Sequence, residues 1–241
     1  MSPLGVLVGV GVGPGDPELL TAKAARVLRE ADRVFAPSVA VDAVGRAESI
    51  VRQGVPGLGV ERLVFPMNGD AAAPGGAFGS AATRLAECLA AGERVAFVTL
   101  GDPNIYSTFS SLAGAVRARC PGAVVETVPG ITAFQDLASR AGTVLLDGTE
   151  RLSLVTALDG PSALDDALHD PGRAVVVYKG GRHVPAIARS LARAGRLEGA
   201  VLGELLGLPG ERVVRASEAG EGPATYLATV IVPPAGRGDA R

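Results

Sequence analysis

The sequence predicts an α/β protein with two domains, the first built on a mostly parallel sheet with flanking helices and the second on a mixed sheet. In the first half of the chain, short apolar runs alternate with segments whose apolar residues recur at helical spacing, which is typical of βαβ units. In the second half, strand-like runs become more frequent relative to helical ones. The 241 residues can form two compact domains. Because the pattern loosens around 143–150, we expect a boundary near Asp147 and domains 1–147 and 148–241.

The first predicted element is a strand. The run 4–12 is almost continuously apolar with valine at alternate positions, which indicates a buried parallel strand. A helix should follow, capped by Asp16 and with Pro17 at its first position, and continue to about Ala31. The same unit recurs through the first half, with strands expected at 33–36, 61–65, 94–100 and 124–128 and helices at 44–53, at 79–91 and up to about 119.

The second half supplies the strands of the mixed sheet. Strands are expected at 151–156, 173–178, 200–204, 211–215 and 225–232, with helices at 161–168 and 184–194. The last residues, 237–241, read as a frayed tail.

The composition restricts the kinds of partner. The chain has 33 glycines but only six Phe, three Tyr and no Trp. Glycine allows tight bends and close backbone approach, so the excess indicates binding by loops and main-chain amides. Aromatic stacking platforms for nucleic acid are not expected. The 23 basic and 25 acidic residues give a net charge of −2, which leaves no electrostatic footprint for nucleic acid.

Metal and membrane sites are not expected either. His169 and His183 are the only histidines, and neither stands at a metal-binding spacing. No apolar stretch reaches 18 residues, and no export signal precedes the first strand. We therefore expect a cytoplasmic protein with no bound metal.

Three glycine-bearing loops follow predicted strands: Gly13-Pro14-Gly15, Gly101-Asp102-Pro103 and Pro129-Gly130-Ile131-Thr132. Open α/β sheets bind ligands at the carboxyl ends of their strands, so together these loops suit one polar ligand. Taken singly, each is also explained by a tight turn or a helix cap. A dinucleotide fingerprint is excluded, because Pro14 and Asp16 stand where G-x-G-x-x-G requires glycine.

The segments 8–21, 99–106 and 128–132 resemble the three signatures of the tetrapyrrole methylases, and the resemblance extends over 4–232. Within that family, the Tyr106-Ser-Thr ending of the second signature is similar to the branch that methylates the C-20 meso carbon of precorrin-2 or of cobalt-factor II. Lys179-Gly-Gly-Arg182, Gly207-Leu-Pro-Gly-Glu-Arg212 and Val64-Phe-Pro-Met67 are also similar to that branch. The residues do not distinguish the metal-free substrate from the cobalt form.

The resemblance implies a homodimer of two-domain chains that binds S-adenosylmethionine in the cleft between domains, and a tetrapyrrole substrate. The cofactor residues that it implies are Pro14, Leu100, Gly101, Asp102, Ile105, Tyr106, Thr132, Ala133, Tyr178, Leu206, Thr225, Tyr226 and Leu227. Two of these depart from the family pattern: Tyr178 stands where relatives often have Met, and Thr225 stands where an apolar residue or Pro is commoner.

The substrate of that branch is rich in carboxylates, for which an acidic protein must supply local cations. Arg46, Arg84, Arg140 and Arg182 are the candidates, since a guanidinium can hold a carboxylate with two hydrogen bonds. For each, an ordinary surface arginine is the alternative. No general base is assigned, although Asp102 and Tyr106 are the nearest candidates.

Other functions remain open at this stage. They are a methylase of the same fold that acts at another corrin position, one that acts on ribosomal RNA or a diphthamide precursor, and a non-catalytic small-molecule-binding module.

Overall fold

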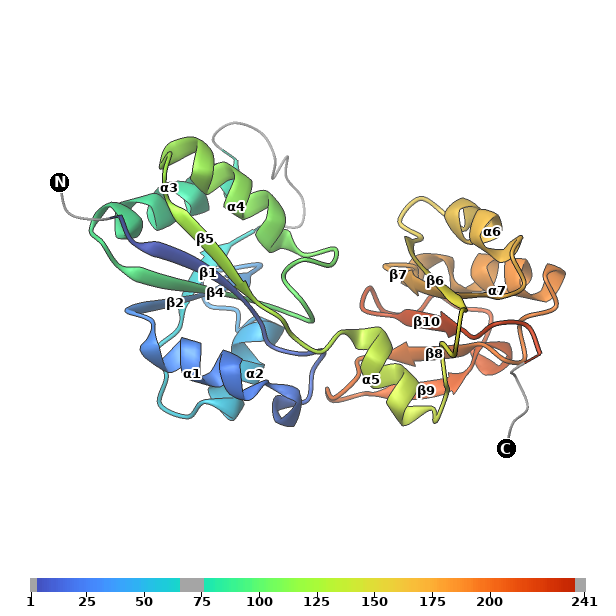
Figure 1. Ribbon diagram of the computed structural model, residues 1–241. Helices are drawn as coiled ribbons and strands as arrows, with labels where there is room; N and C mark the ends of the chain where they lie inside the picture. The colour runs from blue at the N-terminus through green and yellow to red at the C-terminus, as the bar shows by residue number, and fades with distance from the viewer. Residues whose placement is uncertain (1–3, 66–75, 237–241) are drawn as a thin grey trace. The chain divides into compact units, whose positions relative to one another are not determined.

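The computed structural model describes residues 4–65 and 76–236 and divides the chain into two compact units, Met1–Thr132 and Ala133–Arg241. Each unit has its own five-stranded sheet (Figure 1). The division falls before Asp147 because helix α5 (Ala133–Arg140) belongs to the second unit, where its Leu137 packs against Val176 and Ile231. Pro66, Met67 and the tail 237–241 lie outside the described residues.

The first sheet is parallel throughout, as the alternation of strands and helices predicts. Its strand order is β3-β2-β4-β1-β5, so β1 lies between β4 and β5. All five strands therefore end at the same edge of the sheet, which we call the carboxyl edge. The strands are β1 (Val6–Gly11), β2 (Arg33–Ser38), β3 (Glu61–Val64), β4 (Arg94–Thr99) and β5 (Val124–Val128).

Helices cover both faces of this sheet (Figure 1). The helices are α1 (Ala22–Glu30) and α2 (Arg46–Gly54) on one face and α3 (Ala77–Ala90) and α4 (Thr108–Arg119) on the other. Successive side chains of a strand point to opposite faces. Thus Leu7 packs in the core beneath α3 and α4, whereas Val8 and Val10 pack beneath α1 and α2. Burial on both faces explains the nearly continuous apolar run in β1.

The helix expected from Pro17 to Ala31 is two helices, so that prediction is wrong in part. Asp16 caps a single 3-10 turn, η1 (Pro17–Leu19), by accepting a hydrogen bond from the Glu18 N–H at 2.8 Å. Leu20 is extended, and Thr21 then caps α1 by accepting from the Ala24 N–H at 3.1 Å. The spacing of apolar residues does not indicate this break, because the helical spacing continues across it.

The second sheet is mixed, as predicted, with strand order β6-β7-β10-β8-β9. Only the β6–β7 pair is parallel. Its elements are β6 (Arg151–Thr156), α6 (Ser162–Leu168), β7 (Arg173–Tyr178), η2 (Gly181–His183), α7 (Val184–Arg193), β8 (Val201–Glu204), β9 (Arg212–Arg215), η3 (Ala216–Glu218) and β10 (Thr229–Val232). Helices α6 and α7 cover one face with Leu164, Ile187 and Leu191, and α5 covers the other.

The last strand is shorter than expected. The sequence predicts a strand over 225–232, whereas β10 begins at Thr229 and residues 225–228 form an irregular turn before it. The Thr225 N–H donates to the side chain of Glu204, so a side chain on β8 ends the backbone pairing here. In the described part of the chain, no helix is both long enough and apolar enough to span a bilayer.

Candidate active site

The three glycine loops meet at the carboxyl edge of the first sheet. The Gly101 N–H donates to the Gly13 carbonyl oxygen at 2.8 Å, which joins the loops after β4 and β1. The Gly130 N–H donates to Asp102 Oδ2 at 3.1 Å, which joins the loops after β5 and β4. The structure therefore brings together the segments that the sequence only placed at separate strand ends.

Close backbone approach explains why glycine stands at Gly11 and Gly130. A Cβ at Gly130 would overlap the carbonyl oxygen of Gly101, and a Cβ at Gly11 would lie 2.7 Å from the nitrogen of Gly130. Both clashes would be with main-chain atoms, which a rotamer change cannot relieve. These two glycines are thus required for the loops to touch.

Asp102 holds the loop after β4 in shape. Its Oδ1 accepts from the Asn104 N–H at 2.8 Å, and its Oδ2 accepts from the Gly130 N–H. Both carboxylate oxygens therefore accept a hydrogen bond from a backbone donor. This geometry suits a residue that positions loops better than one that accepts a proton from a substrate.

The remaining first-unit residues lie on the same loops. Pro14 is buried in the loop after β1, while Leu100 and Ile105 are partly buried in the loop after β4. Tyr106 is half exposed and has a left-handed φ of 48°. Thr132 is buried, and its Cα lies 3.9 Å from the position of a Cβ on Gly101. All the cofactor candidates of the first unit are thus at one edge.

The second-unit candidates also gather at one sheet edge. Tyr178 ends β7 and pairs with Thr229, the first residue of β10, and Gly203 of β8 pairs with the same residue. We call this the Tyr178 edge. Leu206 is the second residue after β8, and Thr225, Tyr226 and Leu227 lie in the turn before β10.

Backbone contacts fix the loops at the Tyr178 edge. The Ala224 N–H donates to the Gly181 carbonyl at 2.8 Å, and a Cβ on Gly181 would overlap the Thr225 carbonyl. The Phe134 N–H donates to the Tyr178 hydroxyl oxygen at 3.4 Å, which brings the start of α5, with Ala133, to this edge.

Glu204 is a site residue that the sequence analysis missed. It is buried, its Oε1 accepts from the Thr225 N–H at 2.8 Å, and its Oε2 accepts from Arg212 Nη1 at 3.1 Å. It thereby ties the turn before β10 to the end of β8. An acidic residue that ends an otherwise apolar strand was the available signal.

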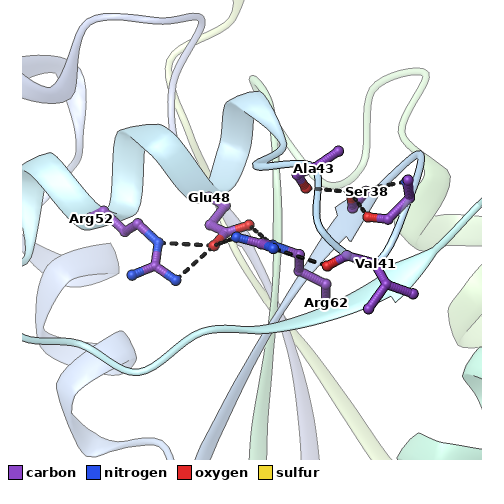
Figure 2. A network of polar contacts seen from close by, with 7 residues as sticks. Ser38, Val41, Ala43, Glu48, Arg52 and Arg62 are labelled. Atoms are coloured by element: carbon purple, nitrogen blue, oxygen red, sulfur yellow. Dashed lines mark hydrogen bonds and ion pairs between the residues drawn. The ribbon is translucent and has the colours of Figure 1, made fainter.

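A second missed group orders the loop between β2 and α2 (Figure 2). Glu48 is completely buried and accepts from Arg62 Nε at 2.6 Å and Nη2 at 2.9 Å, and from Arg52 Nε at 2.8 Å. Hydrogen bonds from Arg62, and secondarily from Arg52, lower the pKa of the Glu48 carboxyl, although burial acts in the opposite direction.

The same group reaches the carboxyl edge. Arg62 Nη1 also donates to the Val41 carbonyl at 2.9 Å, and the Ser38 hydroxyl lies 2.7 Å and 2.6 Å from the carbonyl oxygens of Ala40 and Ala43. This loop follows β2, so it lies at the same sheet edge as the glycine loops. The ion pairs therefore hold a loop that borders the candidate site.

The four arginine candidates differ in their surroundings. Arg46 and Arg182 are exposed and form no ion pair with any described residue. Arg84 pairs with Glu61, the first residue of β3, and so lies near the opposite edge of the sheet from the glycine loops. Arg140 pairs with Asp136 at 2.9 Å and with Glu211 at 2.8 Å. Only Arg46 and Arg182 retain an uncommitted charge.

No metal-binding cluster of three or more His, Cys, Asp or Glu side chains occurs within residues 4–65 and 76–236.

Comparisons with known proteins agree with this arrangement. The chain is 36% identical over 245 residues to a precorrin-2 C(20)-methyltransferase from Sinorhizobium sp., covering 97% of this chain and 98% of that protein. It is 33% identical over 234 residues to a cobalt-precorrin-2 C(20)-methyltransferase from Salmonella typhimurium, covering 95% and 96%. A uroporphyrin-III C-methyltransferase from Thermus thermophilus, solved in complex with S-adenyl homocysteine, superposes with a TM-score of 0.66 at 26% identity, covering 95% of this chain and 97% of that one.

The family model of the tetrapyrrole (corrin/porphyrin) methylases matches residues 6–220, a span that includes the three glycine loops, Tyr178 and Leu206 and ends before the turn 225–228. With two full-length relatives above 30% identity, the match is not confined to the signatures. The chain belongs to the tetrapyrrole (corrin/porphyrin) methylase family.

Proposed function

We propose that the protein transfers the methyl group of S-adenosylmethionine to the C-20 meso carbon of precorrin-2, or of its cobalt-containing counterpart, in cobalamin biosynthesis. The observation that carries this proposal is the end-to-end likeness to two relatives named for that reaction. The three intact loops at the carboxyl edge support it, because a non-catalytic relative has no need to keep all of them.

We propose that residues at the carboxyl edge of the first sheet and at the Tyr178 edge of the second bind the same cofactor. They are the thirteen residues from Pro14 to Leu227 that the family resemblance implies. Each edge by itself offers groups that suit part of such a molecule: main-chain groups in glycine-rich loops with the apolar side chain of Ile105 at the first, and the apolar side chain of Leu206 at the second. Bound there, S-adenosylmethionine would supply an electrophilic methyl group; its transfer to the meso carbon would break the C–S bond, release S-adenosylhomocysteine and require the loss of a proton from that carbon.

The protein's task is then to position the two reactants. Asp102 fixes the loops after β4 and β5 against each other, so its proposed role is orientation. Tyr106 is the other candidate for a role near the reacting carbon, since it is half exposed on the same loop. No general base follows from this geometry.

Arg182 and Arg46 are the proposed ligands of the substrate carboxylates. Both are exposed and uncommitted, whereas Arg84 and Arg140 already hold carboxylates of the chain itself. A guanidinium that leaves an ion pair to bind substrate must first give up that pairing, which reduces its net contribution.

A direct assay tests the function. The protein is incubated with labelled S-adenosylmethionine and, in parallel, precorrin-2, cobalt-factor II and uroporphyrinogen III, and the methylated position is read by NMR. We expect C-20 methylation of one of the first two. Methylation of uroporphyrinogen III alone would instead favour a methylase acting at another position.

Binding of the cofactor is tested separately by calorimetry with S-adenosylhomocysteine. We expect a single site per chain, weakened in Asp102→Ala, and the absence of any binding would overturn the proposal. From the same family resemblance we propose a cytoplasmic homodimer, for which light scattering should give twice the mass of the 24.2 kDa chain.

A further inference from the structure

Three non-glycine residues in the described part of the chain adopt a left-handed backbone: Tyr106, Lys179 and Leu205, with φ of 48°, 58° and 50°. An L side chain is strained in this region, which glycine occupies freely. Tyr106 lies in the loop after β4, Lys179 directly follows β7, and Leu205 directly follows β8. The strain is therefore confined to the two edges that carry the proposed site, where side chains are retained for function.

Lys179 is the only charged residue of the three. It precedes Gly180 and Gly181, yet glycine is placed there for space and not for backbone conformation. A Cβ on Gly180 would lie 2.7 Å from Ile187 Cδ1, and one on Gly181 would overlap the Thr225 carbonyl, whereas neither residue has a left-handed φ. The loop thus has a lysine at the one position where its backbone favours glycine.

The choice of lysine is itself unusual in this chain. Lys23 and Lys179 are its only lysines, and the other 21 of its 23 basic residues are arginines. An ammonium is a compact, strongly hydrated point charge on a flexible stem, whereas a guanidinium is a planar fork. A composition that uses arginine almost everywhere indicates that position 179 requires the smaller cation.

No residue that the structure describes neutralises the charge of Lys179. Neither Lys179 nor Arg182, three residues further in the same loop, forms an ion pair with any residue that the structure describes. The neighbouring loop after β6 contacts this one through the Leu158 carbonyl, 3.2 Å from His183 Nε2, and Asp159 of that loop forms no ion pair either. Two cations without partners at a ligand-binding edge suit an anionic group.

We propose that Lys179 binds a carboxylate substituent of the tetrapyrrole, beside Arg182, and so is a substrate-binding residue. This inference rests on the proposed methyltransferase function. The proposal explains three observations: the left-handed backbone at Lys179, the use of lysine in a chain whose basic residues are otherwise almost all arginine, and a charge that pairs with no described residue. The proposal assigns Lys179 to the substrate, whereas Tyr178, its neighbour in the chain, is expected to contact the cofactor.

Kinetics with four variants test the proposal. Lys179→Met removes the charge, Lys179→Gly removes it and relieves the strain, Lys179→Arg keeps it, and Lys23→Met removes the other lysine, which is exposed on α1. We expect Lys179→Met and Lys179→Gly to raise KM for the tetrapyrrole about tenfold or more, as loss of a charge-assisted hydrogen bond does. The dissociation constant of S-adenosylhomocysteine should stay within about twofold, as for two sites without shared partners.

Lys179→Gly provides a check against a merely structural role. Its Tm should rise because the left-handed backbone suits glycine, while its KM rises with that of Lys179→Met. Lys179→Arg should recover part of the loss, and Lys23→Met should behave as wild type. An unchanged KM in Lys179→Met, with an active wild type, would overturn this inference alone.

Limited acetylation gives a readout that does not depend on turnover. With two lysines in the chain, mass spectrometry after acetic anhydride treatment reports each one directly. We expect precorrin-2 or cobalt-factor II to protect Lys179 and leave Lys23 reactive. Protection by S-adenosylhomocysteine alone would assign Lys179 to the cofactor and overturn the proposal, and a wild type that methylates neither tetrapyrrole would overturn both it and the proposed function.

Discussion

At the scale of single residues, Gly130 is a position where the candidate site tolerates little change. In Gly130→Ala the added methyl group would overlap the carbonyl oxygen of Gly101, so one of the two loops must move. We expect a loss of about 2–3 kcal/mol in the free energy of unfolding, as for overpacked cores, and at least about tenfold weaker binding of S-adenosylhomocysteine. Urea denaturation and calorimetry measure the two effects.

Gly114 is the matched control. It is an exposed glycine within α4, and a Cβ there would have no neighbour within 4 Å. Gly114→Ala should therefore stabilise the protein by about 0.5–1 kcal/mol, because alanine favours the helix, and leave cofactor affinity unchanged. Equal affinities in the two variants would show that contact between the loops is not needed for binding.

Glu48 makes the stability of the first unit depend on pH. Because Arg62 and Arg52 lower the pKa of its carboxyl in the folded state, the contribution of Glu48 is complete above the unfolded pKa of about 4.3 and is lost as the pH falls through the lower folded value. Glu48→Gln cannot form these ion pairs. It should lose about 2–3 kcal/mol at pH 7 and show a flatter loss of stability between pH 5 and pH 3.

Glu30 serves as the control for this prediction. It pairs with Arg26 one turn away on α1, and both side chains are at least half exposed. Glu30→Gln should change stability by less than about 0.5 kcal/mol. Chemical denaturation of the two variants at several pH values measures the difference, and parallel pH profiles for wild type and Glu48→Gln would contradict the prediction.

The sequence predicted part of the arrangement at the candidate site and missed the rest for one physical reason, while the functional roles of these residues stay predictions. Gly101, Asp102 and Thr132 could be predicted because loops at the ends of parallel strands must meet at one edge. The partners Glu48 and Arg62, and Glu204 and Arg212, could not be found in this way. Whether the two residues of such a pair meet depends on how the elements that carry them are aligned in the fold. Local sequence patterns do not specify that alignment.

At the scale of elements, the loop between β8 and β9 is tied to α5. Arg140 Nη1 donates to Glu211 Oε1 at 2.8 Å, and Glu211 Oε2 accepts from the Gly207 N–H at 2.6 Å. Leu206, a proposed cofactor residue, stands next to that amide. We therefore propose that Arg140 positions this loop, while the substrate contact that the sequence suggested stays an untested prediction.

A double-mutant cycle separates these two roles. If Arg140 positions the loop, Arg140→Met and Glu211→Gln should each weaken S-adenosylhomocysteine binding and cost about 0.5–1 kcal/mol of stability, and the double variant should be little worse than either. Calorimetry measures the affinity for S-adenosylhomocysteine, and thermal unfolding measures the stability, of wild type, the two single variants and the double variant. A rise in the KM for the tetrapyrrole in Arg140→Met alone would instead support direct substrate binding.

The break between η1 and α1 shows a limit of predicting helices from the spacing of apolar residues. The run from Pro17 to Ala31 has continuous helical spacing, yet Thr21 accepts the hydrogen bond that starts a new helix, and Leu20 is extended before it. A threonine competes for backbone donors in this way at any helix start. The spacing predicted which residues face the core and could not locate the break.

At the scale of the whole molecule, fold class was the most predictable property. A strand that is buried on both faces, such as β1, has a nearly continuous apolar sequence, which few other structures produce. When such strands alternate with helices along the chain, a parallel sheet covered by helices is the expected fold. The division of the chain was harder to predict, because α5 follows the first sheet in sequence but packs through Leu137 on the second.

Amide hydrogen exchange of the whole chain tests whether both units bind one cofactor. A ligand at a hundredfold excess over its dissociation constant stabilises the bound state by about 2.7 kcal/mol and slows exchange by up to about a hundredfold wherever opening requires its release. We expect S-adenosylhomocysteine to slow exchange in 100–106 and 130–133, and also in 178–181, 204–207 and 224–227. The turn 56–59, which precedes β3 and so lies away from the carboxyl edge, should exchange at an unchanged rate. Protection confined to one unit would mean that the other does not contribute to cofactor binding, whereas protection in both, abolished together in Gly130→Ala, is what a shared ligand requires.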